Sequence, residues 1–83
     1  MSHPEDFNEV DSYSLGNHLL DKGKYDEAIA AFEKAIQEFG TKSQYIDISA
    51  CHYGIGHAYY SKGQFDQAIA QYKIALEMRQ ANL

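Results

Sequence analysis

Lys22–Ala30 reads K-G-K-Y-D-E-A-I-A, and Lys62–Ala70, forty residues later, reads K-G-Q-F-D-Q-A-I-A. The match extends beyond these stretches at the same offset, where Gly16 aligns with Gly56. A chain that repeats itself at such a period is typical of a repeat protein. Nine positions of the first copy are identical in the second: Tyr13, Gly16, Lys22, Gly23, Asp26, Ala28, Ile29, Ala30 and Ala35.

The clearest helix follows the first copy of this stretch. Apolar residues recur every three or four positions over fifteen residues, and charged residues occupy the opposite side. This spacing predicts an amphipathic helix over residues 25–39, which Gly40 ends. Its apolar face consists of Tyr25, Ala28, Ile29, Phe32, Ala35, Ile36 and Phe39.

Two further helices are predicted from capping patterns and glycines. Ser2–Glu5 combines a capping serine, a proline and a glutamate, which predicts a helix from there to about Lys22. Gly23 ends that helix in the left-handed conformation that glycine adopts readily. The capping pattern at residues 41–44 predicts another helix over about 42–61.

The fourth helix begins after Gly63, which repeats the role of Gly23, and runs to about Ala81. Gly16 and Gly56 occupy the same place in both copies, which indicates close approach of two helices there. The predicted inner face of the fourth helix is Phe65, Ala68, Ile69, Tyr72, Ala75 and Leu76. The sequence therefore predicts an all-α fold of two helix–turn–helix units with short antiparallel connections.

Composition limits the classes of function. The chain has 83 residues, which suffice for one domain, and a net charge of −5. Without a basic patch we expect no nucleic-acid partner, and without a long apolar run we expect no membrane span. Cys51 is the only cysteine, which fits a reducing compartment, so we expect a cytoplasmic protein.

The chain resembles the tetratricopeptide repeat family, in a longer variant of about forty residues. The first copy supplies Leu15, Gly16, Leu19, Gly23, Tyr25, Ala28, Phe32 and Ala35, and the second supplies Ile55, Gly56, Tyr59, Gly63, Phe65, Ala68, Tyr72 and Ala75. Two features depart from the family pattern. Ser12 and His52 stand at its tryptophan position, and Gly40 and Gln80 stand at its late proline position.

The resemblance implies one domain, residues 1–83, that forms a short right-handed α-solenoid. The first repeat covers about residues 1–40 and the second about 41–82. It also implies a non-catalytic scaffold that binds a peptide or helix of a partner protein in a concave groove. Carried over by position, the groove residues are Tyr13, Asn17, Leu20, Asp21, Tyr53, His57, Tyr60 and Ser61. The alternative is that these side chains only cover the helices or pack on a neighbouring chain.

Some members of the family hold a C-terminal carboxylate in a clamp of lysine, asparagine and arginine. Asn17 matches one asparagine of that clamp, but Tyr13 and Gly54 stand at the lysine and second asparagine positions. A third repeat with the remaining cations is also absent from the sequence. We therefore do not expect a carboxylate clamp.

The copies differ on the last helix. Ile74 and Met78 replace Lys34 and Glu38 of the first copy. They create a second apolar stripe, which could contact a further repeat, serve a homodimer, or be scattered exposure. Self-association through Ala70, Ile74, Met78 and Ala81 is therefore the alternative function, and it would make the protein a homo-oligomer.

Catalytic and metal-binding chemistry find no support in the sequence. Cys51, His52 and His57 are close along the chain, but His52 and His57 lie about 140° apart on a helix. His18 and Asp21 have suitable spacing without a third ligand. We therefore expect no metal, no cofactor and no catalytic residue, and Cys51 is expected to be a small core residue.

Overall fold

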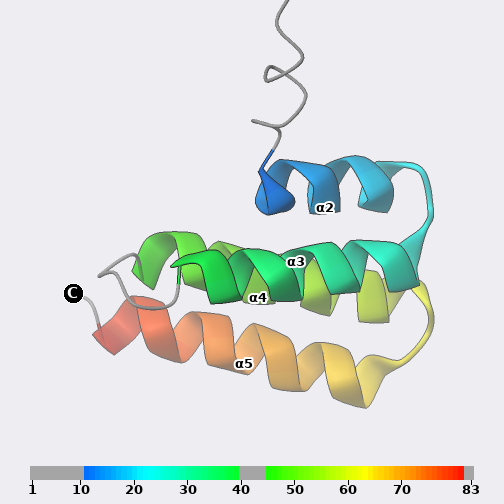
Figure 1. Ribbon diagram of the computed structural model, residues 1–83. Coiled ribbons are helices and arrows are strands. Elements are labelled where there is room, and N and C mark those ends of the chain that lie inside the picture. The colour runs from blue at the N-terminus through cyan, green and yellow to red at the C-terminus, as the bar shows by residue number, and fades with distance from the viewer. Residues whose placement is uncertain (1–10, 40–44, 82–83) are drawn as a thin grey trace, which may run out of the picture.

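The computed structural model describes residues 11–39 and 45–81, and helices account for most of both segments (Figure 1). No strand occurs in these two segments, which confirms the all-α prediction. The four described helices are α2 (Ser12–Asp21), α3 (Tyr25–Phe39), α4 (Tyr45–Ser61) and α5 (Phe65–Ala81).

The helices form two antiparallel pairs, α2 with α3 and α4 with α5, stacked through α3 and α4. In Figure 1, α2 and α5 lie on opposite sides of the stack, with α3 and α4 between them. Among the described helices, α3 packs against both α2 and α4, whereas α5 packs against α4 alone. One side of α5 is therefore left without a neighbouring helix in the described part of the chain.

The repeated lysine–glycine pair closes the first helix of each pair. Gly23 has φ of 78° and Gly63 has φ of 82°, the left-handed region that disfavours other residues. The Gly23 N–H donates to the Leu20 carbonyl at 3.0 Å, and the Lys24 N–H donates to the Leu19 carbonyl at 2.9 Å. These two bonds define a Schellman motif, and the second copy repeats it. The predicted helix-ending role of both glycines is confirmed.

The start of the first helix was predicted incorrectly. Asp11 is extended, with φ of −73° and ψ of 166°, and its carboxylate accepts a hydrogen bond from the Ser14 N–H at 2.7 Å. Asp11 therefore caps a helix that begins at Ser12, because its side chain satisfies a free N–H of the first turn. A continuous helix from Ser2 to Lys22 is excluded. The proposed cap at residues 2–5 lies outside the described residues.

The ends of the other helices agree more closely with the sequence. α3 ends at Phe39, directly before Gly40, and α5 ends at Ala81 as predicted. α4 is described from Tyr45 to Ser61, and its end agrees with the prediction. Gly40 and the capping pattern at 41–44 lie outside the described residues.

Phe32 is the centre of the core. Its side chain is fully buried between two glycines of different helices, Gly16 of α2 and Gly54 of α4. A Cβ atom added to Gly16 would lie 2.7 Å from the Phe32 ring, and one added to Gly54 would lie 2.6 Å from it. The glycines therefore allow both helices to approach α3 closely. The core cluster around Phe32 consists of Ala28, Ile29, Ala35, Cys51, Ile55 and Ala58.

The predicted inner face of the fourth helix is only partly buried. Ala68 and Ala75 are buried and Tyr72 is half-buried, but Phe65, Ile69 and Leu76 are 55%, 62% and 56% exposed. The same positions of α3 are buried or half-buried because α4 packs over them. No described helix follows α5 to do the same. An amphipathic pattern identifies an apolar face, but it does not show whether another element of the chain covers that face.

Candidate partner-binding surface

Helix α4 presents its four predicted groove residues to solvent. Tyr53, His57, Tyr60 and Ser61 follow i, i+4, i+7, i+8 spacing, which places them on one face of the helix. Tyr53 is 57% exposed and Tyr60 is 58% exposed, and His57 and Ser61 are also exposed. Residues on other sides of the helix, including Cys51, Ile55 and Ala58, are buried in the core. The exposed face therefore belongs to a well-anchored helix.

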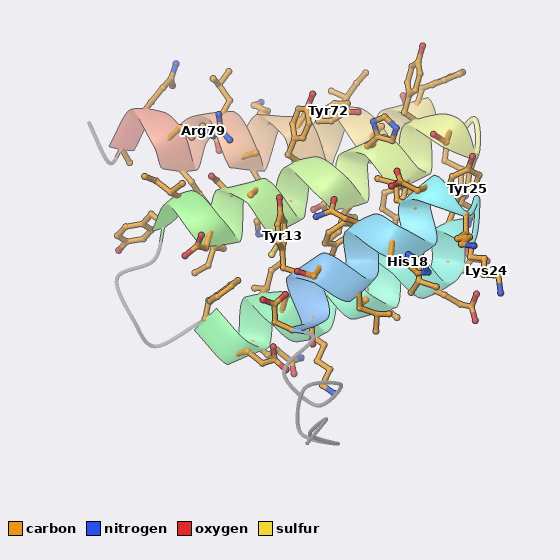
Figure 2. All side chains as sticks on the ribbon, turned by 90° about the horizontal axis from the view of Figure 1, so that it is seen from above. Tyr13, His18, Lys24, Tyr25, Tyr72 and Arg79 are labelled. Atoms are coloured by element: carbon orange, nitrogen blue, oxygen red, sulfur yellow. The ribbon has the colours of Figure 1, made fainter. Side chains whose placement is uncertain are left out.

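Helix α2 contributes a less exposed set at the equivalent positions. Tyr13, Asn17 and Leu20 are half-buried, whereas Asp21 is exposed. Figure 2 shows Tyr13 between α2 and α4, and its ring lies 5.9 Å from that of Phe32. Tyr13 and Leu20 pack against the core cluster, so part of their surface already serves the fold. α2 and α4 also contact each other, so their predicted residues belong to two adjoining helices.

The two exposed tyrosines of the predicted groove, Tyr53 and Tyr60, each pack against an aromatic ring of α5. The Tyr53 and Tyr72 ring centroids are 5.2 Å apart, and those of Tyr60 and Phe65 are 5.3 Å apart. Tilted ring pairs at these distances are favourable, and they restrict the side chains before any partner binds. Burial, with smaller effects of Tyr53 and Tyr60, raises the pKa of Tyr72. The Tyr72 phenol therefore remains a hydrogen-bond donor to a higher pH than an exposed tyrosine would.

A cavity of about 420 Å³ lies between Tyr53 of α4 and the open side of α5. Tyr72, Ala75 and Leu76 supply its apolar wall, and Arg79 lies at its edge. The Arg79 Nε donates to the Ser49 hydroxyl at 3.3 Å. Tyr72 and Arg79 are labelled on α5 in Figure 2.

These α5 residues were not among the predicted site residues. The sequence pattern predicts that the apolar residues on the open side of α5 lie on its inner face, because the same pattern occurs in α3. These residues are Phe65, Ile69, Tyr72 and Leu76. Comparison of the two copies could have identified this exposed face from the sequence. A face that the next helix covers in the first copy remains open in the second copy unless another element follows.

Hydrogen-bonded polar side chains occupy the family's tryptophan position, between the two helices of each antiparallel unit. The Ser12 hydroxyl donates to the Glu38 carboxylate at 3.0 Å, linking α2 to α3. His52 Nδ1 shares a hydrogen bond of 2.8 Å with the Gln71 side-chain oxygen, linking α4 to α5. Ser12 and His52, the two residues at the family's tryptophan position, therefore each join the helices of one pair by a side-chain hydrogen bond.

The residues considered for metal binding do not converge. Within residues 11–39 and 45–81, no group of three or more His, Cys, Asp or Glu side chains could hold a metal ion. Cys51 is fully buried in the core cluster, as predicted, and His52 is engaged with Gln71. None of the described helices has the length and apolar character needed to cross a membrane.

The burial of Cys51 should make its thiol unreactive in the folded protein. Burial, together with the carboxylates of Asp47, Asp11 and Glu38, raises the pKa of Cys51 from 9.0 to about 11. The thiolate is the reactive form, so we expect a disulfide reagent at pH 8 to label the folded chain far more slowly than the denatured chain. Rapid labelling of the folded chain would contradict the buried position.

The same pKa shift has a consequence for stability. The unfolded thiol ionises near pH 9.0, whereas the folded thiol resists ionisation until about pH 11. The resulting contribution to stability is fully present below pH 9 and is lost as the pH rises towards 11. A Cys51→Ala variant should lack this part of the alkaline decline in a urea titration.

Two stacked antiparallel helix pairs define an α-helical repeat protein of the solenoid class. The chain belongs to the tetratricopeptide repeat family, because the family profile described as "Tetratricopeptide repeat" matches residues 8–81. No significant match was found among curated proteins or solved structures. Tetratricopeptide repeats are in general protein–protein interaction modules and are typically non-catalytic.

Proposed function

We propose that this chain is a non-catalytic scaffold that binds a peptide or helix of a partner protein across α2 and α4. The observation that carries the proposal is the exposure of two large tyrosines, Tyr53 and Tyr60, on one anchored helix face. Tyrosine is enriched at interface hot spots because a rigid ring with a polar tip gives contact area at low entropic cost. Asn17 and His57 add polar groups at equivalent positions of the two helices.

The experiment begins with peptides selected from a random displayed library on the immobilised chain. The selected peptide, carrying a fluorophore, is then titrated with each variant. We expect Tyr60→Ala, and Asn17→Ala combined with His57→Ala, each to weaken binding about tenfold or more, as hot-spot truncations do. Far-UV circular dichroism checks that each variant keeps its helix content.

The matched control lies on a different helix surface. Glu33→Ala with Lys34→Ala changes two exposed residues of α3 and should leave the affinity unchanged. If the groove variants bind the peptide with the same affinity as the unchanged chain, the proposed binding groove is contradicted. The double variant Tyr53→Ala, Tyr60→Ala serves as the strongest version of the test, because it removes both exposed rings.

Self-association through the last helix is the second candidate function. Its predicted residues are Ala70, Ile74, Met78 and Ala81. Three of them, Ile74, Met78 and Ala81, line a cavity of about 320 Å³ together with Tyr45 of α4 and Glu77. Met78 is half-buried, so this stripe already has contacts within the chain. The other apolar face of α5, which includes Phe65, Ile69 and Leu76, is more exposed than this stripe.

We also propose that the module works in a reducing compartment such as the cytoplasm. The support is its single, buried cysteine, which has no partner cysteine in the sequence. Fluorescence microscopy of the tagged full-length protein tests this location.

A further inference from the structure

The open face of α5 consists of Phe65, Ile69, Tyr72 and Leu76, and it repeats an interface that the chain already makes. At the forty-residue offset, these residues correspond to Tyr25, Ile29, Phe32 and Ile36 of α3. The α3 residues are buried or half-buried, and the adjoining α4 supplies Cys51, Gly54, Ile55 and Ala58 to that contact. The open face therefore has the chemistry of a helix–helix contact surface.

The other end of the stack does not fit this face. At the α2 end, the residues that correspond to Cys51, Gly54, Ile55 and Ala58 are the N-cap Asp11 and the helix residues Ser14, Leu15 and His18. Three of these four are polar or charged, and all four are exposed. Stacking the α2 end of one copy on the α5 end of another would bury an Asp and a His against apolar rings, which is costly. Head-to-tail assembly is therefore disfavoured.

The α5 face is instead complementary to itself. Asp66 and Lys73 are seven residues apart, two helical turns, on the edge of the open face that lies away from Ala68 and Ala75. In two antiparallel α5 helices related by a two-fold axis near Ile69 and Ala70, Asp66 of each copy faces Lys73 of the other. Matching edges meet in an antiparallel, isologous contact, so both ion pairs form at once.

The same register also matches the apolar residues. Residues that face each other across an antiparallel helix pair have numbers that add up to the same value. Pairing Asp66 with Lys73 sets this value at 139. Phe65 then falls between Tyr72 and Leu76 of the second copy, and Ile69 packs beside its counterpart. One alignment thus satisfies both the charges and the apolar side chains.

We propose that the chain forms a two-fold symmetric homodimer in which the open faces of two α5 helices pack antiparallel. The proposal goes beyond the groove and gives the second candidate function a different contact surface. The open face does not include the groove residues Asn17 and His57, but it adjoins the groove, because Tyr53 stacks on Tyr72 and Tyr60 stacks on Phe65. The dimer would carry two copies of the groove and so be a bivalent form of the same module.

Sedimentation velocity of the full chain over a wide concentration range tests the proposal. The unchanged chain should be a dimer that dissociates on dilution. Ile69→Glu should weaken dimerisation about a hundredfold or more, because it places a carboxylate inside the contact. Ile69 is exposed in the single chain, so the variant should keep its helix content. The control, Met78→Glu on the other stripe of α5, should remain a dimer.

Charge reversal tests the antiparallel register. Asp66→Lys and Lys73→Asp should each weaken dimerisation about tenfold, since two attractive pairs become repulsive. The double variant that carries both changes should recover the original affinity. A double variant as weak as the single variants would overturn the register.

The remaining outcomes are also decisive. A dimer that Met78→Glu disrupts and Ile69→Glu does not would overturn this face while leaving self-association in place. A chain that stays monomeric at all concentrations would overturn both this contact face and self-association. Neither result bears on the groove, because peptide binding by Asn17 and His57 is measured separately.

Discussion

Phe32→Ala is expected to lower the free energy of unfolding by about 3–5 kcal/mol, the usual cost of removing a fully buried phenylalanine. Phe32 fills the space between Gly16 and Gly54, and neither glycine has a side chain that could close the cavity. For a domain of this size, the melting temperature should fall by about 12 °C or more. Urea denaturation followed by circular dichroism gives the free energy.

Tyr72→Ala is the matched control for this experiment. Tyr72 occupies the equivalent place in the second copy, where it packs against Gly56 but is covered on one side only. Its replacement should lower the free energy of unfolding by about 1–2 kcal/mol at a concentration where the chain is monomeric. Equal losses for the two variants would contradict the difference in burial between the copies.

Gly54→Ala should also destabilise the protein, although alanine is the better helix former. The gain in helix propensity is about 1 kcal/mol. Against it, the new methyl would lie 2.6 Å from a ring that Gly16 contacts from another helix, so Phe32 has little freedom to move. Overpacking of this kind costs about 1–3 kcal/mol. Because the ring is held from both sides, we expect the upper end and a net loss of about 2 kcal/mol.

A double-mutant cycle and a control distinguish this clash from a general effect of the substitution. Phe32→Leu makes room, so it should reduce the cost of Gly54→Ala. Ser14→Ala is the control, because Ser14 is the exposed residue at the corresponding place in the first copy. It should leave stability unchanged or raise it by a few tenths of a kcal/mol. A Gly54→Ala chain more stable than the original would refute the close packing.

Local signals in the sequence predicted most of the fold. The apolar period of residues 25–39 and the two lysine–glycine pairs fix the helices and turns, because spacing and left-handed glycine are local properties. The start of the first helix was predicted incorrectly because the cap that begins α2 lacks the full capping pattern in the sequence. The Asp11 side chain accepts from the Ser14 N–H, but no Glu or Gln stands three residues after Asp11.

Predicting the site was harder because exposure depends on distant neighbours. Ile29 and Ile69 are identical by sequence, yet one is buried and the other is exposed, because only the first has a helix packed over it. Gly54 illustrates the same limit. By resemblance it marked a missing asparagine, whereas in the structure it makes room for Phe32. Its counterpart, Ser14, has no preceding helix pair to contact among the described residues, which explains why the two copies differ there.

Among the described helices, α3 has neighbours packed on two sides and α5 on one, so the second copy keeps an open contact surface. Native-state amide hydrogen exchange, measured on the Ile69→Glu monomer, tests it most directly. We expect the amides of α3 to exchange most slowly and those of α5 markedly faster. Amides of α5 that are as protected in this monomer as those of α3 would contradict the claim.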